Sequence, residues 1–365
     1  MIRLQQWRLF DWVLFLDALW LIAIGVITIW SVDVARGGDV ANGKRQLFAL
    51  AIGLVIFAVA SFAAANFYRA TAHWWYAAGI LALVLVLIFG TVIRGTRGWF
   101  QIGGFSLQPI EFMKVALVLV FASFASRQRH ALKHFSFFLG SALLVAVPMA
   151  LTIIQPDFGS AMLLGLFWFC MMLLVRARAR YVVSLIALVA VAGTLAWFFV
   201  LQPYQKDRLI TFVNPAHDPL GAGYNITQSI IAVGSGRFLG RGLGLGSQSQ
   251  LRFLPESHTD FIFAVIAEAF GLIGSLIVIG SFVLLWYRLI RMMTRATDDF
   301  YLFVLAGALV MLAGQWMVNL GATIGLFPVT GVPMPLVSYG GSSLVATLLL
   351  LGIAESMHSA KRGEY

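Results

Sequence analysis

The sequence predicts an all-α polytopic membrane protein, with about ten transmembrane helices and one long extracytoplasmic loop between spans seven and eight. Two features of composition predict this class: 61% of the 365 residues are hydrophobic and only 11% are charged, a more apolar balance than ordinary soluble domains have. The third observation is that the apolar residues gather in runs long enough to cross a bilayer. We expect residues 1–365 to form a single integral membrane domain.

The apolar runs define the expected spans in chain order. Each is about as long as a helix needs to cross the hydrocarbon layer, and most are joined by short polar segments. The spans are expected roughly at residues 9–31, 44–65, 72–92, 108–126, 135–154, 158–175, 181–201, 261–287, 301–324 and 338–357.

The distribution of lysine and arginine predicts the orientation. With the amino terminus inside, fourteen of these cations fall on the inner side and five on short outer loops, as the positive-inside rule requires. Both termini are therefore expected in the cytoplasm and the long loop, 201–260, outside. Most of the net charge of +10 follows from this topology, which makes nucleic acid a poor candidate partner.

The loop 201–260 is long enough to be functional or disordered. Its aromatic and aliphatic residues, such as Tyr224, Phe238 and Phe253, can bury apolar surface, so we expect short, partly embedded helices there. Its glycines allow two interpretations, close backbone packing or amide groups that face an anion, and packing is favoured. These glycines are Gly234, Gly236, Gly240, Gly242, Gly244 and Gly246.

The chain offers little for redox or zinc chemistry. Cys170 is the single cysteine, and the six histidines show no paired spacing, so neither an internal disulfide nor a zinc site is readable.

Asp260 is the strongest candidate catalytic residue. It stands where the polar loop becomes an apolar span, and a carboxylate in that position can act at the membrane surface. His258 and Thr259 directly precede it, and we expect them to orient Asp260 or to contact substrate.

The fourth span begins with a proline and carries Glu111 and Lys114 three residues apart, on one helix face. An unpaired ammonium at that depth is costly, so Glu111 is its expected partner. Two roles are open: a structural ion pair that fixes helix packing, or a clamp in which Lys114 binds a phosphate while Glu111 holds it in place.

Two further segments lie at the same outer rim. Asp157 can cap the sixth span or serve the site, and the two roles are weighed equally; Gln155 beside it adds a second polar group. Arg97 and Trp99 form an interfacial set before the fourth span.

These residues belong to motifs that resemble the signatures of the SEDS family, and the resemblance covers essentially the whole chain. The matching segments are RGWFQIG at 97–103, QPIEFMK at 108–114, QPDFG at 155–159, GAGYNITQS at 221–229, GLGLG at 242–246, FLPESHTDF at 253–261 and PMPLVSYGGS at 333–342. The compact termini and the block at 258–264 look more like the elongation branch, RodA, than the division branch, FtsW.

The resemblance implies a peptidoglycan glycosyltransferase that polymerises lipid II at the outer face of the bacterial cytoplasmic membrane during cell elongation. It also implies a class B penicillin-binding protein as transpeptidase partner, with other membrane proteins of the elongation machinery. Such a reaction needs a base and a cationic clamp. Asp260 is the expected general base, with undecaprenyl pyrophosphate as the leaving group and inversion at the anomeric carbon.

The remaining expected site residues would bind substrate around Asp260. Lys114 and Arg208 are the candidate pyrophosphate clamps, and a divalent cation, Mg²⁺ or Mn²⁺, could assist, although no ligand cluster is readable. The other expected substrate-binding residues are Glu111, Arg97, Trp99, Gln155, Asp157, His258, Thr259 and Ser338.

Two other classes of function stay open. A lipid II flippase would need polar groups along a continuous path across the membrane, whereas the informative charges collect at the outer rim. A non-catalytic scaffold for a cell-wall synthase would dock a partner through small-residue surfaces such as 321–325, but it would not need Asp260.

Overall fold

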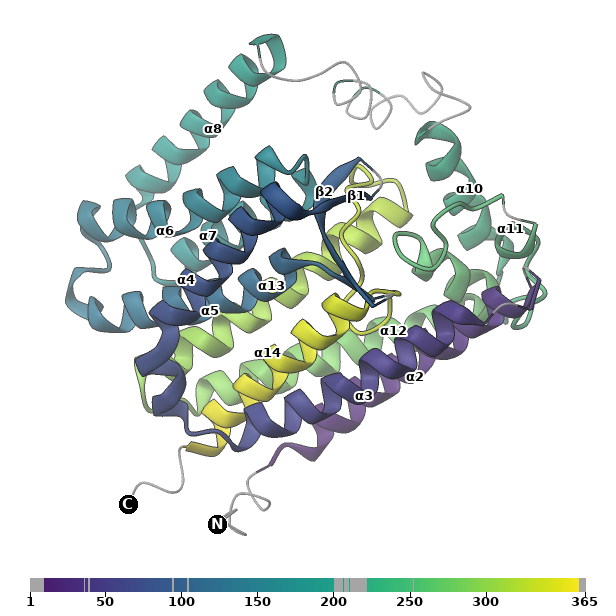
Figure 1. Ribbon diagram of the computed structural model, residues 1–365, viewed down its shortest axis with the longest axis horizontal. Coiled ribbons are helices and arrows are strands. Elements are labelled where there is room, and N and C mark those ends of the chain that lie inside the picture. Colours follow the sequence, from purple (N-terminus) through teal and green to yellow (C-terminus); the bar gives the residue numbers. More distant parts are fainter. Residues whose placement is uncertain are drawn as a thin grey trace.

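The computed structural model describes residues 10–199 and 222–360, apart from positions 36, 39, 94, 104 and 252, and also residues 206 and 210. Ten long helices in these ranges correspond one to one with the ten expected spans (Figure 1). They are α2 (Trp12–Ala35), α3 (Ala41–Phe62), α4 (Ala65–Phe89), α5 (Pro109–Arg127), α6 (Phe135–Ile154), α7 (Phe158–Leu174), α8 (Ala179–Phe199), α12 (Ile262–Thr294), α13 (Asp299–Thr323) and α14 (Gly341–Ser359).

The membrane class is confirmed by the helices themselves. Eight of the helices in the described ranges are long and apolar enough to cross a membrane, and α7 is a shorter apolar helix. The third span is the least accurate prediction: α4 begins at Ala65 rather than near residue 72. Its first turns carry polar and aromatic residues, including Tyr68, whose hydroxyl donates to the carbonyl of Ala60 at 2.8 Å, and hydropathy alone does not include such residues in a span.

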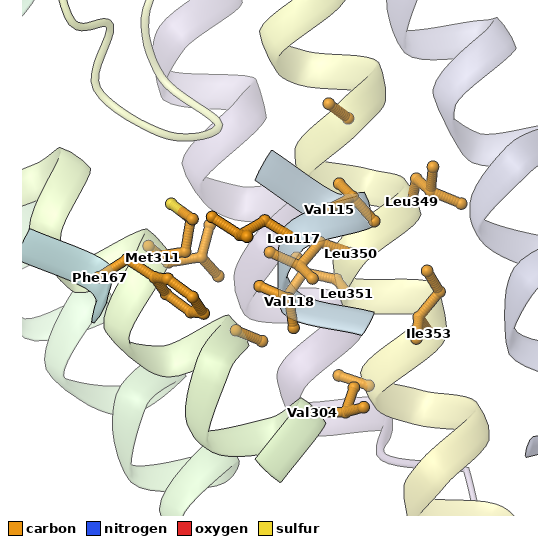
Figure 2. Packing of buried hydrophobic residues seen from close by; sticks show 14 of the residues in the cluster. Val115, Leu117, Val118, Phe167, Val304, Met311, Leu349, Leu350, Leu351 and Ile353 are labelled. Atoms are coloured by element: carbon orange, nitrogen blue, oxygen red, sulfur yellow. The ribbon is translucent and has the colours of Figure 1, made fainter. Parts of the chain in front are cut away.

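The centre of the bundle is filled by apolar side chains. In α5 and α14 nearly every residue from Met113 to Phe121 and from Leu344 to Ala354 is buried, which is typical of helices surrounded by other helices. Figure 2 shows Val115, Leu117 and Val118 of α5 beside Phe167 of α7 and residues of α13 and α14.

Two short regions of secondary structure lie between the long helices, and only one of them was predicted. The expected short helices in the long loop are present as α10 (Ala222–Ser235) and α11 (Ser247–Gln250). The segment before α5, predicted as an irregular loop, is instead an antiparallel sheet in the order β1 (Thr91–Ile93), β2 (Thr96–Ile102), β3 (Phe105–Leu107). A short 3-10 turn, η1 (Arg129–Ala131), joins α5 to α6.

The helix α12 is broken at Gly271, which has φ 67° and ψ −160°. The break frees backbone groups, and the loop before the helix satisfies them: the amide of Leu272 donates to the carbonyl of Arg237 at 2.8 Å, and the amide of Arg241 donates to the carbonyl of Glu268 at 2.9 Å. Irregular backbone at membrane depth is tolerated only when it is buried in protein in this way.

The loop glycines make this contact possible. A Cβ atom on Gly236 would lie 1.9 Å from the carbonyl oxygen of Ala267, and one on Gly240 would lie 2.2 Å from that of Ala269. Both distances are impossible for real atoms, so the loop approaches α12 this closely because it has no side chains there. The packing interpretation of the glycine run is confirmed at these positions.

The end of the bundle where α2 begins and α14 ends is held by ion pairs (Figure 1). The Arg288 guanidinium on α12 binds both carboxylate oxygens of Asp11, and the amide of Asp11 donates to Glu355 on α14 at 2.9 Å. Arg69 pairs with Asp298 in the connection between α12 and α13. The start of α2 and the end of α14 therefore lie at the same end of the bundle, as predicted. That this end faces the cytoplasm stays a prediction.

Candidate active site

Asp260 lies at the opposite end of the bundle, in the turn that precedes α12. It lines a cavity of about 350 Å³, which is in the size range of ligand pockets. Four connections supply the wall: Thr96 and Trp99 from β2, Asp157 before α7, Asn225 and Glu256 from the long loop, and Thr330 after α13. A carboxylate expected from sequence at a membrane surface therefore faces an internal space shared by several helices.

Hydrogen bonds within the turn itself hold the backbone around Asp260. The carbonyl of Glu256 accepts the amides of Thr259 and Asp260, both at 3.1 Å. The carbonyl of Asp260 then accepts the side-chain amide of Asn319 on α13 at 3.2 Å. These bonds hold the Asp260 backbone in a fixed position at the cavity wall.

A second anchor comes from the segment before α14. The Ser338 hydroxyl donates to the carbonyl of Thr259 at 2.7 Å, and the amide of Tyr339 donates to the carbonyl of His258 at 2.8 Å. Gln46 on α3 donates in turn to the carbonyl of Ser338 at 3.2 Å. Ser338, expected to bind substrate, is buried and lies behind the turn instead of on the cavity wall.

A third anchor reaches the turn from α2. The imidazole Nε2 of His258 lies 3.4 Å from Oδ1 of Asp33, and Asp33 also accepts from the Asn42 side chain and the Gly43 amide, both at 3.0 Å. The Thr259 hydroxyl lies 3.3 Å from Oε2 of Glu256. His258 and Thr259 therefore contact the scaffold of the turn, which fits the expectation that they orient Asp260.

Asp157 caps α7 and also lies on the cavity wall, while its role in the site stays a prediction. Its carboxylate caps α7 by accepting the amide of Ser160 at 3.0 Å and its hydroxyl at 2.8 Å, and it also lines the cavity. Burial raises the pKa of Asp157, while these hydrogen bonds and the nearby Lys114 ammonium oppose the rise.

Lys114 and Glu111 form the expected pair, with Nζ 2.7 Å from Oε2. Each is only 3% exposed, and neither is among the residues that line the cavity. The pair lies near enough to Asp157 for both charges to act on its carboxylate. In this arrangement the Lys114 ammonium already has its counter-ion, so a phosphate could reach it only after that ion pair opened.

The other expected site residues are dispersed. Arg97 points its guanidinium toward the carbonyl of Leu87 at 3.4 Å, and Gln155 is buried, with its amide donating to the carbonyl of Leu83 at 3.1 Å. Arg208 lies outside the described residues. Of the predicted set, the structure brings Asp260, Asp157 and Trp99 together on the cavity wall.

Sequence reasoning missed several residues of the site. Glu256, Gln108, Asn225 and Thr330 also line the cavity. Glu256 precedes Asp260 by four residues in a turn-forming segment, and this spacing was a readable signal. The contact of Asp33 with the Asp260 turn had no such signal, because the two are far apart in the chain.

The expectation of a divalent cation was tested against the side chains present. Within the described ranges, no three histidine, cysteine or carboxylate residues converge in a way that could hold a metal ion. The Glu111 carboxylate is engaged by Lys114. Metal dependence therefore stays a prediction without a ligand set.

The chain is similar to known proteins over nearly its full length. The profile of the cell cycle protein family FtsW/RodA/SpoVE matches residues 11–363. The peptidoglycan glycosyltransferase MrdB of Escherichia coli K12 is 38% identical over 94% of this chain and 91% of its own length. A probable peptidoglycan glycosyltransferase FtsW of Coxiella burnetii is 37% identical over 95% of each chain.

Solved structures share the fold over nearly the full length. A chain from work on structural coordination of polymerization and crosslinking by a peptidoglycan synthase complex superposes with a TM-score of 0.80, at 30% identity over 97% of this chain and 99% of its own. The rod shape determining protein RodA of Thermus thermophilus gives a TM-score of 0.70, at 28% identity over 97% and 98%. With its family profile, its relatives and its fold in agreement, this chain belongs to the SEDS family, the FtsW/RodA/SpoVE proteins.

Proposed function

We propose that this protein polymerises lipid II into glycan strands at the outer face of the cytoplasmic membrane, acting as a peptidoglycan glycosyltransferase in cell elongation. The observation that carries the proposal is the placement of Asp260, held by its backbone to α13 and the segment before α14, on the wall of a cavity of about 350 Å³. Peptidoglycan glycosyltransfer is the activity given for the Escherichia coli and Coxiella relatives.

Asp260 acts as the general base in this proposal. Its carboxylate takes the proton from the 4-hydroxyl of the acceptor GlcNAc as that oxygen attacks the anomeric carbon of the donor. Undecaprenyl pyrophosphate leaves as an anion and needs no protonating acid, unlike the leaving group of an ordinary glycoside. Direct displacement of this kind inverts the anomeric centre.

The pyrophosphate requires positive charge that the described cavity wall does not offer. No lysine or arginine is among its described lining residues. Arg208 on the long loop is the first candidate clamp. We assign Lys114 a supporting role behind Asp157, because its ammonium is already paired with Glu111 at 2.7 Å.

The central packing favours an enzyme over a flippase. A flippase needs a polar route through the bundle, whereas α5, α7, α13 and α14 meet in a layer of buried aliphatic and aromatic side chains (Figure 2). The cavity and its carboxylates lie at one end of this layer. Such a site can take substrate from one membrane face without moving it across.

A class B penicillin-binding protein is the proposed transpeptidase partner, with other membrane proteins of the elongation machinery. The similar chain from a peptidoglycan synthase complex supports this assignment. Identity alone does not separate elongation from division, because MrdB and the Coxiella FtsW are 38% and 37% identical to this chain. The elongation role rests on the RodA-like block at 258–264.

The test is polymer formation by the purified protein. Reconstituted vesicles carrying lipid II are incubated with wild-type protein and with Asp260→Asn, alone and with a class B penicillin-binding protein whose transpeptidase is blocked. We expect long glycan strands with wild type and none with Asp260→Asn. Lipid II moved between leaflets without any polymer would establish the flippase, and neither polymer nor movement with wild-type protein would favour the scaffold. Polymer made equally well by Asp260→Asn would overturn the general-base role of Asp260.

A further inference from the structure

Gln46 is a polar residue on a face of α3 that otherwise packs through small and apolar side chains. It is 1% exposed and lies between Gly43 and Ala49 on the buried face of the helix. A Cβ atom on Gly341 of α14 would lie 3.3 Å from the Cβ atom of Ala49, so this face packs against the start of α14. An amide buried in such a place is costly unless both its oxygen and its nitrogen have partners. Its hydrogen-bond partners therefore indicate its role.

Both ends of the Gln46 amide bind the backbone just before α14. Its Nε2 donates to the carbonyl of Ser338 at 3.2 Å, and its Oε1 accepts the amide of Gly340 at 3.1 Å. A carbonyl needs a donor and an amide needs an acceptor, so these two partners define the orientation of the Gln46 side chain. The segment 338–340 is thereby held to α3 at two points.

The segment 338–340 also holds the turn of the proposed base. The Ser338 hydroxyl donates to the carbonyl of Thr259 at 2.7 Å, and the amide of Tyr339 donates to the carbonyl of His258 at 2.8 Å. These two carbonyls belong to the two residues that directly precede the base in the chain. A continuous chain of hydrogen bonds therefore runs from α3 to the turn.

The first turn of α3 is itself anchored to α2. Asp33 accepts the Asn42 side chain and the Gly43 amide, both at 3.0 Å, about one helical turn before Gln46. The same carboxylate lies 3.4 Å from Nε2 of His258. The hairpin of α2 and α3 thus contacts the turn of the base by two routes, one direct and one through the segment before α14.

We propose that Gln46 is a positioning residue for polymerisation, which holds the Asp260 carboxylate in line with the attacking hydroxyl through the segment 338–340. This inference rests on the proposed function and deepens it, because it names a buried residue that supports the proposed base from behind the cavity wall. A misplacement of about 1 Å can slow a chemical step about a hundredfold. In the alternative role, Gln46 only joins α3 to α14.

Two variants of Gln46 and one control separate these roles. Gln46→Met keeps an unbranched side chain of similar length but removes both hydrogen-bonding groups. Gln46→Glu is the conservative variant, because a protonated carboxyl can still accept one bond and donate the other. The matched control is Ser356→Ala. Ser356 is also buried, and its hydroxyl donates to the carbonyl of Ala63 at 2.7 Å, so it joins α14 to the end of α3 away from the cavity.

Gln46→Met and Ser356→Ala should both lower the melting temperature, because each leaves buried backbone groups without a partner. They should differ in the polymerisation of lipid II. In Gln46→Met, kcat per folded molecule should fall about tenfold while KM stays within about twofold of wild type. In Ser356→Ala both constants should be unchanged, and Gln46→Glu should keep more kcat than Gln46→Met.

A double-mutant cycle with Ser338→Ala tests the route. If Gln46 acts through the segment 338–340, the double variant should lose less kcat than the product of the two single effects. Effects that multiply fully would overturn the inference, and so would a Gln46→Met protein with the kcat of wild type.

The proposed function fails separately, if wild-type protein with its partner makes no polymer. Hydrogen exchange then decides on Gln46 without any turnover. The amide of Tyr339, which is bonded to His258, should exchange faster in Gln46→Met than in wild type. An unchanged exchange rate would show that Gln46 does not hold this contact, and would overturn the inference.

Discussion

The two ends of the bundle use their charged residues differently. Where α2 begins and α14 ends, Asp11 binds Arg288 and Asp298 binds Arg69, so acids are matched with bases from other helices. At the opposite end, Asp157, Glu256 and Asp260 face a cavity whose described wall has no lysine or arginine. Matched charges join helices at the first end, whereas the carboxylates at the second end lie on the wall of a cavity.

The Glu111–Lys114 pair does not fit this division by position. It lies near the cavity end, yet it is closed at 2.7 Å and buried, as a structural pair is. We therefore expect that breaking the Glu111–Lys114 pair lowers stability, as breaking a pair between helices would, and has less effect on turnover than the loss of the Asp260 carboxylate.

Asp260→Asn should lower turnover by a factor of about 10² to 10⁴, the usual contribution of a general base. Its free energy of unfolding should change by less than about 1 kcal/mol, because the backbone anchors of the turn remain. The control at the other end is Asp298→Asn, which weakens the pair with Arg69 but should leave turnover unchanged. Initial rates and thermal unfolding of both variants are compared with wild type.

Lys114→Met should lower the free energy of unfolding by roughly 3 kcal/mol or more, because it leaves the Glu111 carboxylate buried without its partner. The double variant Glu111→Leu/Lys114→Met should recover most of that loss. Turnover per folded molecule should stay within a few fold of wild type. A single variant with normal stability and lost turnover would instead identify Lys114 as a phosphate clamp.

Gly271→Ala should destabilise the protein by roughly 2 kcal/mol or more, because a Cβ atom there would lie 2.3 Å from the Gly240 amide nitrogen and φ is positive. Gly280→Ala, in the regular part of the same helix with nothing within 4 Å, should be neutral or slightly stabilising. Denaturation of the two variants in the same detergent tests this. Equal stabilities would mean that the break in α12 is not required.

Asp33→Asn should lower kcat about tenfold with little change in KM, because it removes the charge that faces His258 at 3.4 Å and loosens the turn that carries Asp260. Asp17→Asn, more than four turns earlier on α2, is the control and should keep kcat. The kcat and KM values of the two variants separate a positioning role from a general loss of folded protein.

The helices were predictable because each is an apolar run of membrane-spanning length, and α2, α6 and α14 begin or end within a few residues of the expected bounds. The β1–β3 sheet was missed because its strands are only 3, 7 and 3 residues long and have no clear alternation of apolar and polar residues.

The site was predictable where one local segment carries the signal. Asp260 stands at a loop-to-helix junction, and Glu111 and Lys114 share a helix face, so their positions followed from spacing. Gln155 and Ser338 were predicted as substrate-binding, but their polar groups serve the backbones of Leu83 and Thr259. Which buried polar group faces a cavity and which faces a carbonyl depends on tertiary contacts that local sequence does not encode.

The interruption of α12 at Gly271 has a dynamic consequence. Because the amides of Leu272 and Ile273 are bonded to the carbonyls of Arg237 and Phe238, neither segment can open without exposing the other. The amide protons of 237–242 and 268–273 should then exchange with solvent deuterium at one common rate. Exchange in the loop before α12 would in this way measure the local stability of the short helical segment that follows Asp260.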